Sequence, residues 1–390
     1  MAIYLDHAAT TPVRPPAREA LLASLDAANA SATHTRGQQA RAVVEVARDQ
    51  VAEALGCSPH EVVFTSGGTE ADNIAVAGIV WAARDRVRGV PHVVTTAVEH
   101  AAVGETVRWL AERGFIRVTA VAPEADGRVD IDRVVAAVTD ETVLASVMTA
   151  NNEVGAVNDV AELAVQLADR DVAVHTDAVQ AFATRDVRVG ALGVDALALS
   201  AHKFGGPQGV GVAVLRRGLA VEPVIHGGGQ DRGVRSGTFA VGLIAACGAA
   251  VAAAVAERSE LAARLTRMSD TLAAGLTVID GVRRTGPSDP AWRLASHVHL
   301  LLGGVDADAL AVALDRVGVA GSSGSACSAG AAKASHVLTA MGARGVPLRL
   351  SLGWTTTDDD VAEAVARLSD AITRLRADGP FVLAARDGGR

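Results

Sequence analysis

The fold class of this chain is set by an alternation of short apolar runs and amphipathic segments along residues 62–215. Parallel strands need a crossover between them, usually a helix, so this alternation predicts a doubly wound, mainly parallel sheet covered on both faces. Ligands of such sheets bind at the carboxyl ends of the strands. Six runs are expected to be strands: EVVFTS (61–66), PHVVTTAV (91–98), TVLASVMTA (142–150), VAVHTDAV (172–179), DALALSA (195–201) and GVGVAVL (209–215).

The pattern changes at about residue 258. A long helix is expected there, followed by a strand in SHVHLLLGG (296–304) and by a closing helix. Thr357 and Asp360 have the spacing of a capping box at the start of that helix, and its apolar residues then recur every three or four positions. These features predict a second, smaller α+β domain.

Composition excludes several classes of protein. The net charge is −8, without a basic patch that could bind nucleic acid directly. The three cysteines are widely separated, which favours a reducing cytoplasm over a disulfide framework or a zinc site. The first residues lack the apolar core of a signal peptide. Residues 239–256 are uncharged but rich in alanine and glycine, so we expect a packed interior or interface helix rather than a membrane span.

One lysine stands out. The chain holds 36 lysines and arginines, and only Lys203 and Lys333 are lysines. Arginine stays protonated, whereas a lysine can lose its proton and form a Schiff base. Lys203 follows a predicted strand, in LSAHKFGGPQGVG (199–211), beside Ser200 and His202. It could be a Schiff-base lysine or an ordinary surface lysine.

Polar residues follow the other predicted strands. In FTSGGTEADN (64–73), Gly67 and Gly68 precede a helix start, which could bind an anion or form an ordinary tight turn. Asp177 could hold a pyridine nitrogen protonated or cap the next helix. His100 could stack on a flat ring or shuttle protons. The amides of NNEVG (151–155) could fix a phenolic oxygen. A lone histidine or asparagine is more often structural.

Cys327 lies in GVAGSSGSACSAG (318–330), a run of small residues that could not bury it. We therefore expect an exposed, mobile thiol, which suits a nucleophile that must move during the reaction. Cys57 and Cys247 are expected to be inert. His297 and His299 share a strand face and could suggest a metal pair, but packing is favoured because no acidic or thiol partner has a suitable spacing.

Nine motifs occur in order: YLDHAATTPV, FTSGGTEADN, EHAAV, NNEVG, HTDAVQ, SAHKFGGPQGVG, GVRSGT, SSGSAC and LRLSLGWTTT. Together they resemble the NifS/IscS-type cysteine desulfurases, pyridoxal-phosphate enzymes of the class V aminotransferase group, over nearly the whole chain. The resemblance implies the aspartate-aminotransferase-like fold type I. It implies a large domain of residues 16–257, and a small domain of residues 1–15 and 258–390 with a mobile catalytic-cysteine loop at about 320–331.

The resemblance also implies roles for individual residues. Lys203 would carry pyridoxal 5'-phosphate, and Arg349 would grip the substrate carboxylate with Asn152 nearby. Thr238 would reach the phosphate in the partner subunit, which implies a homodimer. The remaining cofactor contacts would be Gly68, Thr69, Ser200 and His202 at the phosphate, and His100, Asn152, Asp177 and Gln180 at the ring.

The implied reaction converts L-cysteine to L-alanine. Lys203 or His100 would move protons, and the Cys327 thiolate would attack the substrate sulfur and become a persulfide. An acceptor protein would then take the sulfur for iron–sulfur cluster assembly, tRNA thiolation or DNA phosphorothioation, without a direct nucleic-acid or membrane contact. A selenocysteine lyase, a class V aminotransferase and a sulfur-relay scaffold without cofactor are the alternatives. The thiol motif favours desulfuration over transamination.

The chain departs from the family pattern at several positions. ANASATHTRG keeps His34 but lacks the usual Gly-Pro, and Lys333 stands where an acid is common. Trp354 stands where arginine is common, and the connection after Cys327 is short. These changes concern the position of the loop and the choice of partner rather than the chemistry.

Overall fold

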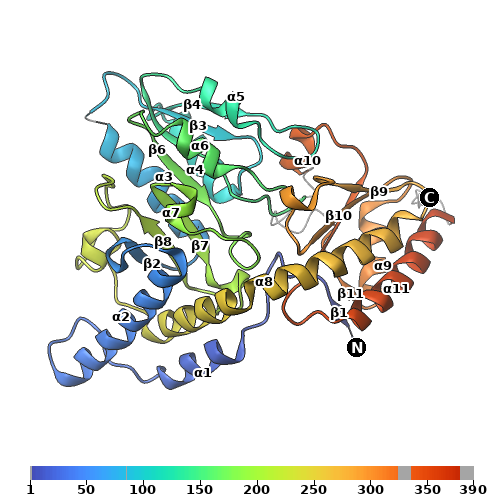
Figure 1. The fold of residues 1–390 in the computed structure, drawn as a ribbon, viewed down its shortest axis with the longest axis horizontal. Coiled ribbons are helices and arrows are strands. Elements are labelled where there is room, and N and C mark those ends of the chain that lie inside the picture. The colour runs from blue at the N-terminus through green and yellow to red at the C-terminus, as the bar shows by residue number, and fades with distance from the viewer. Residues whose placement is uncertain (1, 85, 324–334, 378–390) are drawn as a thin grey trace, which may run out of the picture.

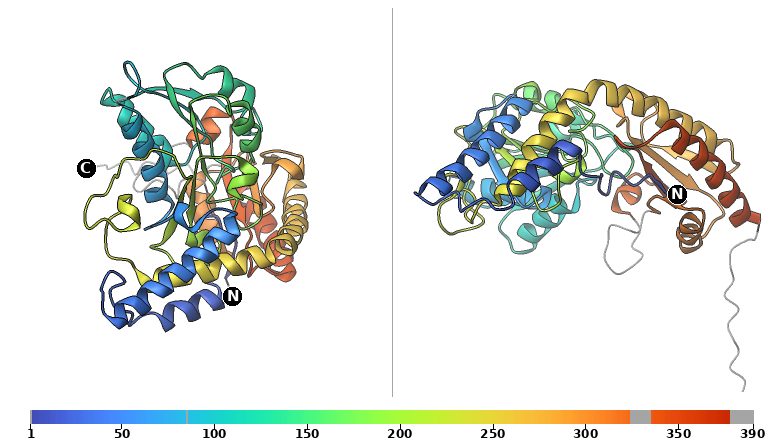
Figure 2. Two further views of the ribbon diagram at one scale, coloured as in Figure 1. Left: turned by 60° about the vertical axis from the view of Figure 1, so that its left-hand side comes forward. Right: turned by 90° about the horizontal axis from the view of Figure 1, so that it is seen from below.

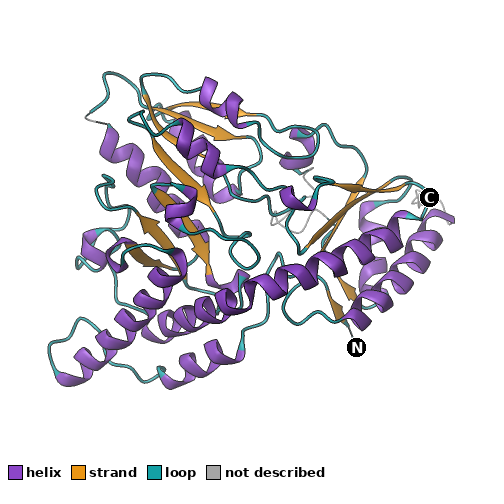
Figure 3. Ribbon diagram, viewed as in Figure 1, coloured by secondary structure: helices purple, strands orange, loops and turns teal. Residues whose placement is uncertain are grey.

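The computed structural model describes residues 2–84, 86–323 and 335–377. It consists of two bodies joined by one long helix, α8 (Val241–Thr277), which runs along both of them (Figures 1 and 2). The larger body holds a seven-stranded sheet, and the smaller body holds two short sheets, as the strand colouring of Figure 3 shows.

The large sheet confirms the predicted fold class. Its strands lie in the order β2 (Val62–Thr65), β8 (Gly211–Leu215), β7 (Ala196–Ser200), β6 (Ala173–Asp177), β5 (Thr142–Ser146), β3 (His92–Thr96) and β4 (Arg117–Val121). Only β8 runs antiparallel to its neighbours, and the remaining pairs are parallel. All six predicted strands are present. The prediction missed β4, an edge strand with four exposed residues.

Helices cover both faces of this sheet. The side chains of β2 alternate between the faces, since Val62 and Phe64 belong to one apolar cluster and Val63 to another. The Val63 face packs against α3 (Gly68–Ala83) and α4 (Ala101–Glu112). The opposite cluster takes residues from α1 (Pro15–Ala23), α2 (Thr35–Leu55), α5 (Ile131–Ala136), α6 (Val160–Gln166), α7 (Val189–Leu192) and the first half of α8.

The first half of α8 contains most of the uncharged stretch 239–256, for which a packed helix was expected. By length and composition this helix could span a membrane, but half of its most apolar window is buried within the protein. It crosses α2 closely at Gly248, where a Cβ would lie 2.8 Å from the Cα of Ala47. The expected packed helix is therefore present. The expected boundary at residue 257 falls inside α8, so the two bodies share this helix.

The smaller body is built on an antiparallel sheet of β9 (Val282–Thr285), β10 (His297–Leu302) and β12 (Val346–Ser351). β1 (Ile3–Tyr4) pairs in parallel with β11 (Val319–Ala320), which places the N-terminal segment in this body. Its helices are α9 (Ala307–Arg316) and α11 (Asp358–Ala377). The short helix α10 (His336–Ala340) packs against the apolar cluster of the larger body through Val337 and Leu338. The predicted capping box is present, because the Asp360 amide donates to Thr357 Oγ1 at 3.1 Å and the Thr357 amide to Asp360 Oδ2 at 2.9 Å.

His297 and His299 are packed within β10. Burial lowers the pKa of each imidazole to about 3, so both are neutral at physiological pH. Nδ1 of His297 lies 2.9 Å from Ser296 Oγ, and Nδ1 of His299 hydrogen-bonds Thr285. The packing role expected from the sequence is confirmed.

Candidate active site

The carboxyl ends of β2, β3, β5, β6 and β7 lie at one edge of the large sheet, and a cavity of about 320 Å³ opens there. Since parallel strands present their carboxyl ends at the same edge, this is the position expected for a ligand. Ten of the predicted site residues line it: Gly68, Thr69, His100, Asn152, Asp177, Gln180, Ser200, His202, Lys203 and Arg349.

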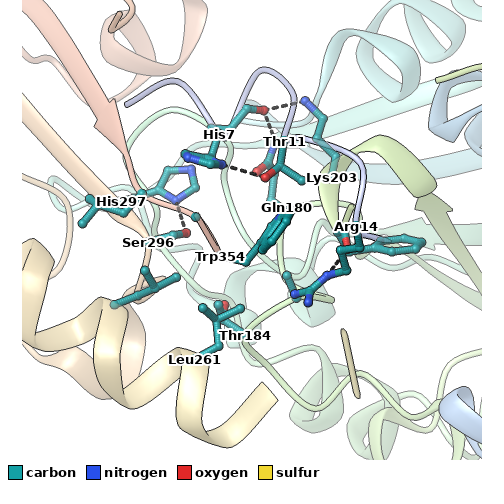
Figure 4. A pocket seen from close by; sticks show the side chains of 16 residues that line it. His7, Thr11, Arg14, Gln180, Thr184, Lys203, Leu261, Ser296, His297 and Trp354 are labelled. Atoms are coloured by element: carbon teal, nitrogen blue, oxygen red, sulfur yellow. Dashed lines mark hydrogen bonds between the residues drawn. The ribbon is translucent and has the colours of Figure 1, made fainter. Parts of the chain in front are cut away.

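Lys203 ends a short 3₁₀ turn, Ala201–Lys203, directly after β7. Its Nζ donates to the backbone carbonyls of Ala8 at 2.5 Å and Ala9 at 2.8 Å, so the N-terminal segment forms one wall beside the amine (Figure 4). Lys203 is half-buried and faces the cavity. This position favours a Schiff-base lysine over an ordinary surface lysine.

The start of α3 forms another wall. A Cβ on Gly68 would lie 2.9 Å from Val179 Cγ2 and 3.4 Å from Ser200 Cβ, so glycine lets the helix start lie against the strand ends. The first N–H groups of a helix have no partner within the helix and attract anions. Together with the Thr69 and Ser200 side chains, they give this end of the cavity the character of a phosphate site.

Two imidazoles line the cavity. Burial, followed by the nearby Lys203 charge, lowers the pKa of His202 to about 4, so this ring is neutral at pH 7. Its Nδ1 lies 3.2 Å from Thr10 Oγ1. His100 caps α4, because its Nδ1 accepts the Ala102 N–H at 3.2 Å. In the neutral ring the proton of His100 is therefore on Nε2.

Asp177 ends β6 and is 5% exposed. Its Oδ1 accepts the Val179 N–H at 2.8 Å. The residues that follow form turns, and the next helix, α7, begins only at Val189, so Asp177 caps a turn rather than a helix. Burial raises the pKa of Asp177, whereas His100, the Val179 amide and Lys203 lower it. A buried carboxylate facing the cavity can pair with a protonated ring nitrogen.

Arg349, on β12, is 5% exposed and lines the same cavity. Its Nη1 donates to the Asn152 carbonyl at 3.0 Å and its Nη2 to Asp6 Oδ1 at 2.9 Å. Its Nε is buried and has no hydrogen-bond partner among the described residues. A buried donor without a partner is costly, so Arg349 is prepared to bind an anion.

Gln180 and Asn152 line the cavity, as predicted. The Gln180 Nε2 donates to the Ala8 carbonyl at 3.0 Å, the carbonyl that also accepts from Lys203. The contact of these two amides with a cofactor oxygen stays a prediction.

Thr238 is exposed and does not line the cavity. Its segment is held beside the site, because Arg235 Nε donates to Glu70 Oε1 at 2.7 Å and Glu70 lies in the first turn of α3. The predicted contact of Thr238 with the phosphate site of a partner subunit stays a prediction, because the structure holds one chain.

Cys327 and Lys333 lie outside the described residues. The chain on either side of them is described and contacts the site. Ser322 pairs with Arg349 through two backbone hydrogen bonds of 2.7 and 3.0 Å. On the other side, Ser335 Oγ donates to Glu153 Oε2 at 2.5 Å.

The sequence reasoning gave no role to three acidic residues near the cavity. Asp6 pairs with Arg349, and Glu99 is buried beside His100. Asp72 follows Thr69 by one helical turn, and one ligand atom each of Asp72, His100 and Asp177 lies within 4.8 Å of the others. The three-residue spacing places Asp72 and Thr69 on one helix face, and this was the one available signal for Asp72.

A smaller hollow, of about 40 Å³, lies on the other side of Lys203 and is shown in Figure 4. His7 lines it, with Nδ1 2.6 Å from Thr11 Oγ1, and burial lowers the pKa of this imidazole to about 4. Trp354 also lines it and donates from Nε1 to the Pro12 carbonyl at 3.0 Å. Trp354, one of the departures from the family pattern, thus contacts the N-terminal segment.

These side chains fit pyridoxal phosphate. The cavity offers an anion site at the start of α3, an amine at Lys203 and a buried carboxylate at Asp177. A phosphorylated pyridine aldehyde carries the three complementary groups: a phosphate, an aldehyde carbon and a basic ring nitrogen. The neutral His202 and the unpartnered Nε of Arg349 add further donors at the cavity wall.

Comparison with known proteins leads to the same family. Residues 3–363 match the family described as Aminotransferase class-V. An IscS-like cysteine desulfurase of Mycobacterium tuberculosis is 46% identical over 382 residues, which cover 96% of this chain and 97% of that protein.

Two solved structures have a similar fold. A NifS-like protein aligns with a TM-score of 0.89 at 31% identity, covering 96% of this chain and all (100%) of that one. A structure described as SspA in complex with cysteine aligns with a TM-score of 0.78 at 30% identity, covering 90% of this chain and 98% of that one.

Proposed function

The chain belongs to the aminotransferase class-V family and is a pyridoxal-phosphate-dependent cysteine desulfurase of the NifS/IscS type, and from this premise we propose which residues perform its reaction. One observation carries the proposal: Lys203, Asp177 and Arg349, on three different elements, line one cavity. An amine, a carboxylate and a guanidinium are the groups needed for the cofactor aldehyde, its ring nitrogen and an amino-acid carboxylate.

Lys203 would carry the cofactor, Asp177 would pair with its ring nitrogen, and His100 would stack on its ring. Its phosphate would bind Gly68, Thr69, Ser200 and His202, and Asn152 and Gln180 would contact its phenolic oxygen. When bound, the cofactor supplies an electron sink for the negative charge that develops on the substrate.

Arg349 would bind the carboxylate of L-cysteine. Its Nη1 and Nη2 are already engaged, so the guanidinium is fixed before the substrate arrives. The unpartnered Nε supports a new contact to one carboxylate oxygen. Such preorganisation holds the substrate Cα in place without ordering a flexible side chain at the moment of reaction.

His100 and Lys203 would move the protons. Because Nδ1 of His100 accepts from the Ala102 amide, Nε2 is the atom that can hold or release a proton at the cavity. The Lys203 amine can take the Cα proton of the substrate once Lys203 is released from the cofactor.

Cys327 would accept the sulfur. Its thiolate attacks the substrate sulfur, and a new S–S bond forms while the bond between the substrate Cβ and its sulfur breaks. The electron pair of that broken bond stays on Cβ, which takes a proton to give L-alanine, and Cys327 becomes a persulfide. The contacts of Ser322 with Arg349 and of Ser335 with Glu153 support this role, because they hold the chain on both sides of Cys327 at the site.

We propose a homodimer in which Thr238 of each subunit serves the other site. The exposure of Thr238 and the Arg235–Glu70 pair beside the phosphate end support this proposal. The proposed division into residues 16–257 and residues 1–15 with 258–390 is supported by the apolar clusters, since one cluster joins Ile3 and Leu5 to residues from Leu261 onward.

The sulfur acceptor would be a protein of iron–sulfur cluster assembly, tRNA thiolation or DNA phosphorothioation. A net charge of −8 favours a protein partner over direct contact with nucleic acid. We propose the cytoplasm as the compartment, since Cys57 and Cys247 are free thiols.

The test is to measure alanine and sulfide from L-cysteine with the wild-type protein, C327S and the matched control C57S. We expect C327S to lose both products and the persulfide while it still binds cofactor, and C57S to resemble wild type. Alanine release at the wild-type rate by C327S would refute the role of Cys327. Keto-acid-dependent amino transfer without sulfide would support a class V aminotransferase, and a strong preference for selenocysteine would support a lyase.

A further inference from the structure

A second buried carboxyl group, Asp72, lies beside Asp177 at the same cavity. Asp72 of α3 is 1% exposed, and neither of its carboxyl oxygens has a hydrogen-bond partner among the described residues. Its Oδ1 lies 3.4 Å from Nε2 of His175, which also has no hydrogen-bond partner there. A fully buried carboxyl without a cationic partner is costly in its ionised form, so this pair requires an explanation.

His175 cannot supply the missing positive charge. Its side chain is fully buried on β6, and burial lowers its pKa to about 3, so the imidazole is neutral at physiological pH. Its Nδ1 lies 2.9 Å from Ser146 Oγ. If Nδ1 carries the proton and donates to Ser146, Nε2 becomes an acceptor that faces Asp72.

Other titratable groups near Asp72 come from β6 and from the link between β3 and α4. They include Asp177, Glu99 and His100. The other strands that α3 contacts, β2, β5, β7 and β8, carry no ionisable side chain. An ionised Asp72 would therefore face two further buried acids. Among the described residues that line the same cavity, the groups near Asp72 that can carry a positive charge are His100 and Lys203.

We infer that Asp72 carries a proton at neutral pH and donates it to Nε2 of His175, so that Asp177 is the anion that faces the ring nitrogen of the cofactor. The inference rests on the role proposed above for Asp177. It makes Asp72 a positioning residue, because Asp72 acts through His175 and Asp177 rather than on the substrate.

The surroundings of the two aspartates decide which of them is protonated. Burial raises the pKa of Asp72 well above its usual range, and Asp177 and Glu99 raise it further. Burial also raises the pKa of Asp177, but His100, the Val179 amide and Lys203 lower it. When two nearby carboxyls cannot both ionise, the less stabilised one holds the proton, and here that is Asp72.

The D72N variant tests whether residue 72 acts as a neutral hydrogen-bond donor or as a carboxylate anion. An asparagine amide can donate to Nε2 of His175 as a carboxylic acid can, so we expect D72N to bind pyridoxal phosphate like wild type. D72A removes the donor, and we expect about tenfold weaker cofactor binding and a shifted pH dependence of the cofactor's absorption band. If D72N is as impaired as D72A, or if D72A matches wild type, the inference is wrong.

Infrared spectra give a readout that needs no activity. The full-length protein, with cofactor and after its removal, should show the C=O stretch of a protonated carboxyl at neutral pH, and D72N should lose that band. The E99Q variant identifies any band from Glu99. An Asp72 signal of the carboxylate form would overturn the inference even if D72A fails to fold.

The D177N variant distinguishes this inference from the proposed function. If D177N leaves the cofactor's affinity and absorption unchanged, the proposed role of Asp177 is wrong. The infrared band of Asp72 then still tests independently whether Asp72 is protonated. If D177N loses cofactor binding but the protonated band is absent from Asp72, the proposed function survives and the inference does not.

Discussion

Asp6 and Arg349 form an ion pair of 2.9 Å between the N-terminal segment and β12, although 343 positions separate them in sequence. The Arg349 side chain is 5% exposed, so Asp6 balances its charge before any substrate carboxylate arrives. Asp6 therefore fixes one edge of the guanidinium, while Nε has no hydrogen-bond partner among the described residues.

Replacing Arg349 by lysine should raise the KM for L-cysteine by about tenfold or more, because an ammonium cannot keep the fork of contacts to Asn152 and Asp6 while binding a carboxylate. The matched control is R344K, since Arg344 is an exposed arginine just before β12. Steady-state kinetics of alanine formation measure both variants. An unchanged KM for R349K would contradict the assigned role.

Thiol alkylation near neutral pH should label Cys327 and spare the other two cysteines. Burial raises the pKa of both Cys57 and Cys247 to about 12, so these thiols stay protonated and unreactive. Mass spectrometry of the alkylated peptides measures the three sites separately. Preferential labelling of Cys57 would show that the nucleophile was assigned to the wrong cysteine.

The buried Glu99 predicts a pH dependence of stability. Burial raises its pKa to about 8, while Thr96 and the Met148 amide donate to its Oε1. Between the unfolded value near 4.5 and about 8, the folded state holds one more proton than the unfolded state. The free energy of unfolding should therefore fall with rising pH in that window, by at most about 1.4 kcal/mol per unit from this group.

The E99Q variant keeps an acceptor for Thr96 and Met148 but removes the titration. Its stability relative to wild type should rise with pH from about 5 to 8 and then level off. E19Q makes the same substitution at an exposed position of α1 and should show no such trend. Urea unfolding at several pH values measures the difference, and parallel curves for E99Q and wild type would contradict a neutral, buried Glu99.

The close crossing of α2 and α8 predicts opposite effects for two glycine substitutions. In G248A the new Cβ would lie 2.8 Å from the Cα of Ala47, so we expect a loss of about 1–3 kcal/mol in stability. In G104A, on α4, the new Cβ meets nothing within 4 Å, and the better helix propensity of alanine should add about 1 kcal/mol. Thermal unfolding compares them, and a neutral G248A would mean that the helices lie further apart.

The sequence predicted the central sheet because its strands are continuous apolar runs between helical segments. β4 was missed for the same reason: at the sheet edge, Arg117 and Thr119 are exposed, so the strand lacks an apolar run. The convergence of Asp177, Ser200 and Lys203 was predictable, since parallel strands end at one edge.

Contacts between distant segments could not be predicted in this way. Nothing local to Asp6 indicates that its partner is Arg349. Asp72 lies in a helix whose other buried residues are mostly apolar, and its proximity to His175 depends on how α3 packs against β6. These contacts arise from tertiary packing, which a pattern along one chain does not encode.

The most direct test of the account is to locate the covalent bond between the cofactor and the chain. The protein is reduced with borohydride, digested and analysed by mass spectrometry, and the chain offers only Lys203 and Lys333 as sites. We predict the phosphopyridoxyl group on Lys203 in wild type and its absence in K203R. A modified Lys333, or no modified lysine in a protein that still desulfurates cysteine, would contradict the account.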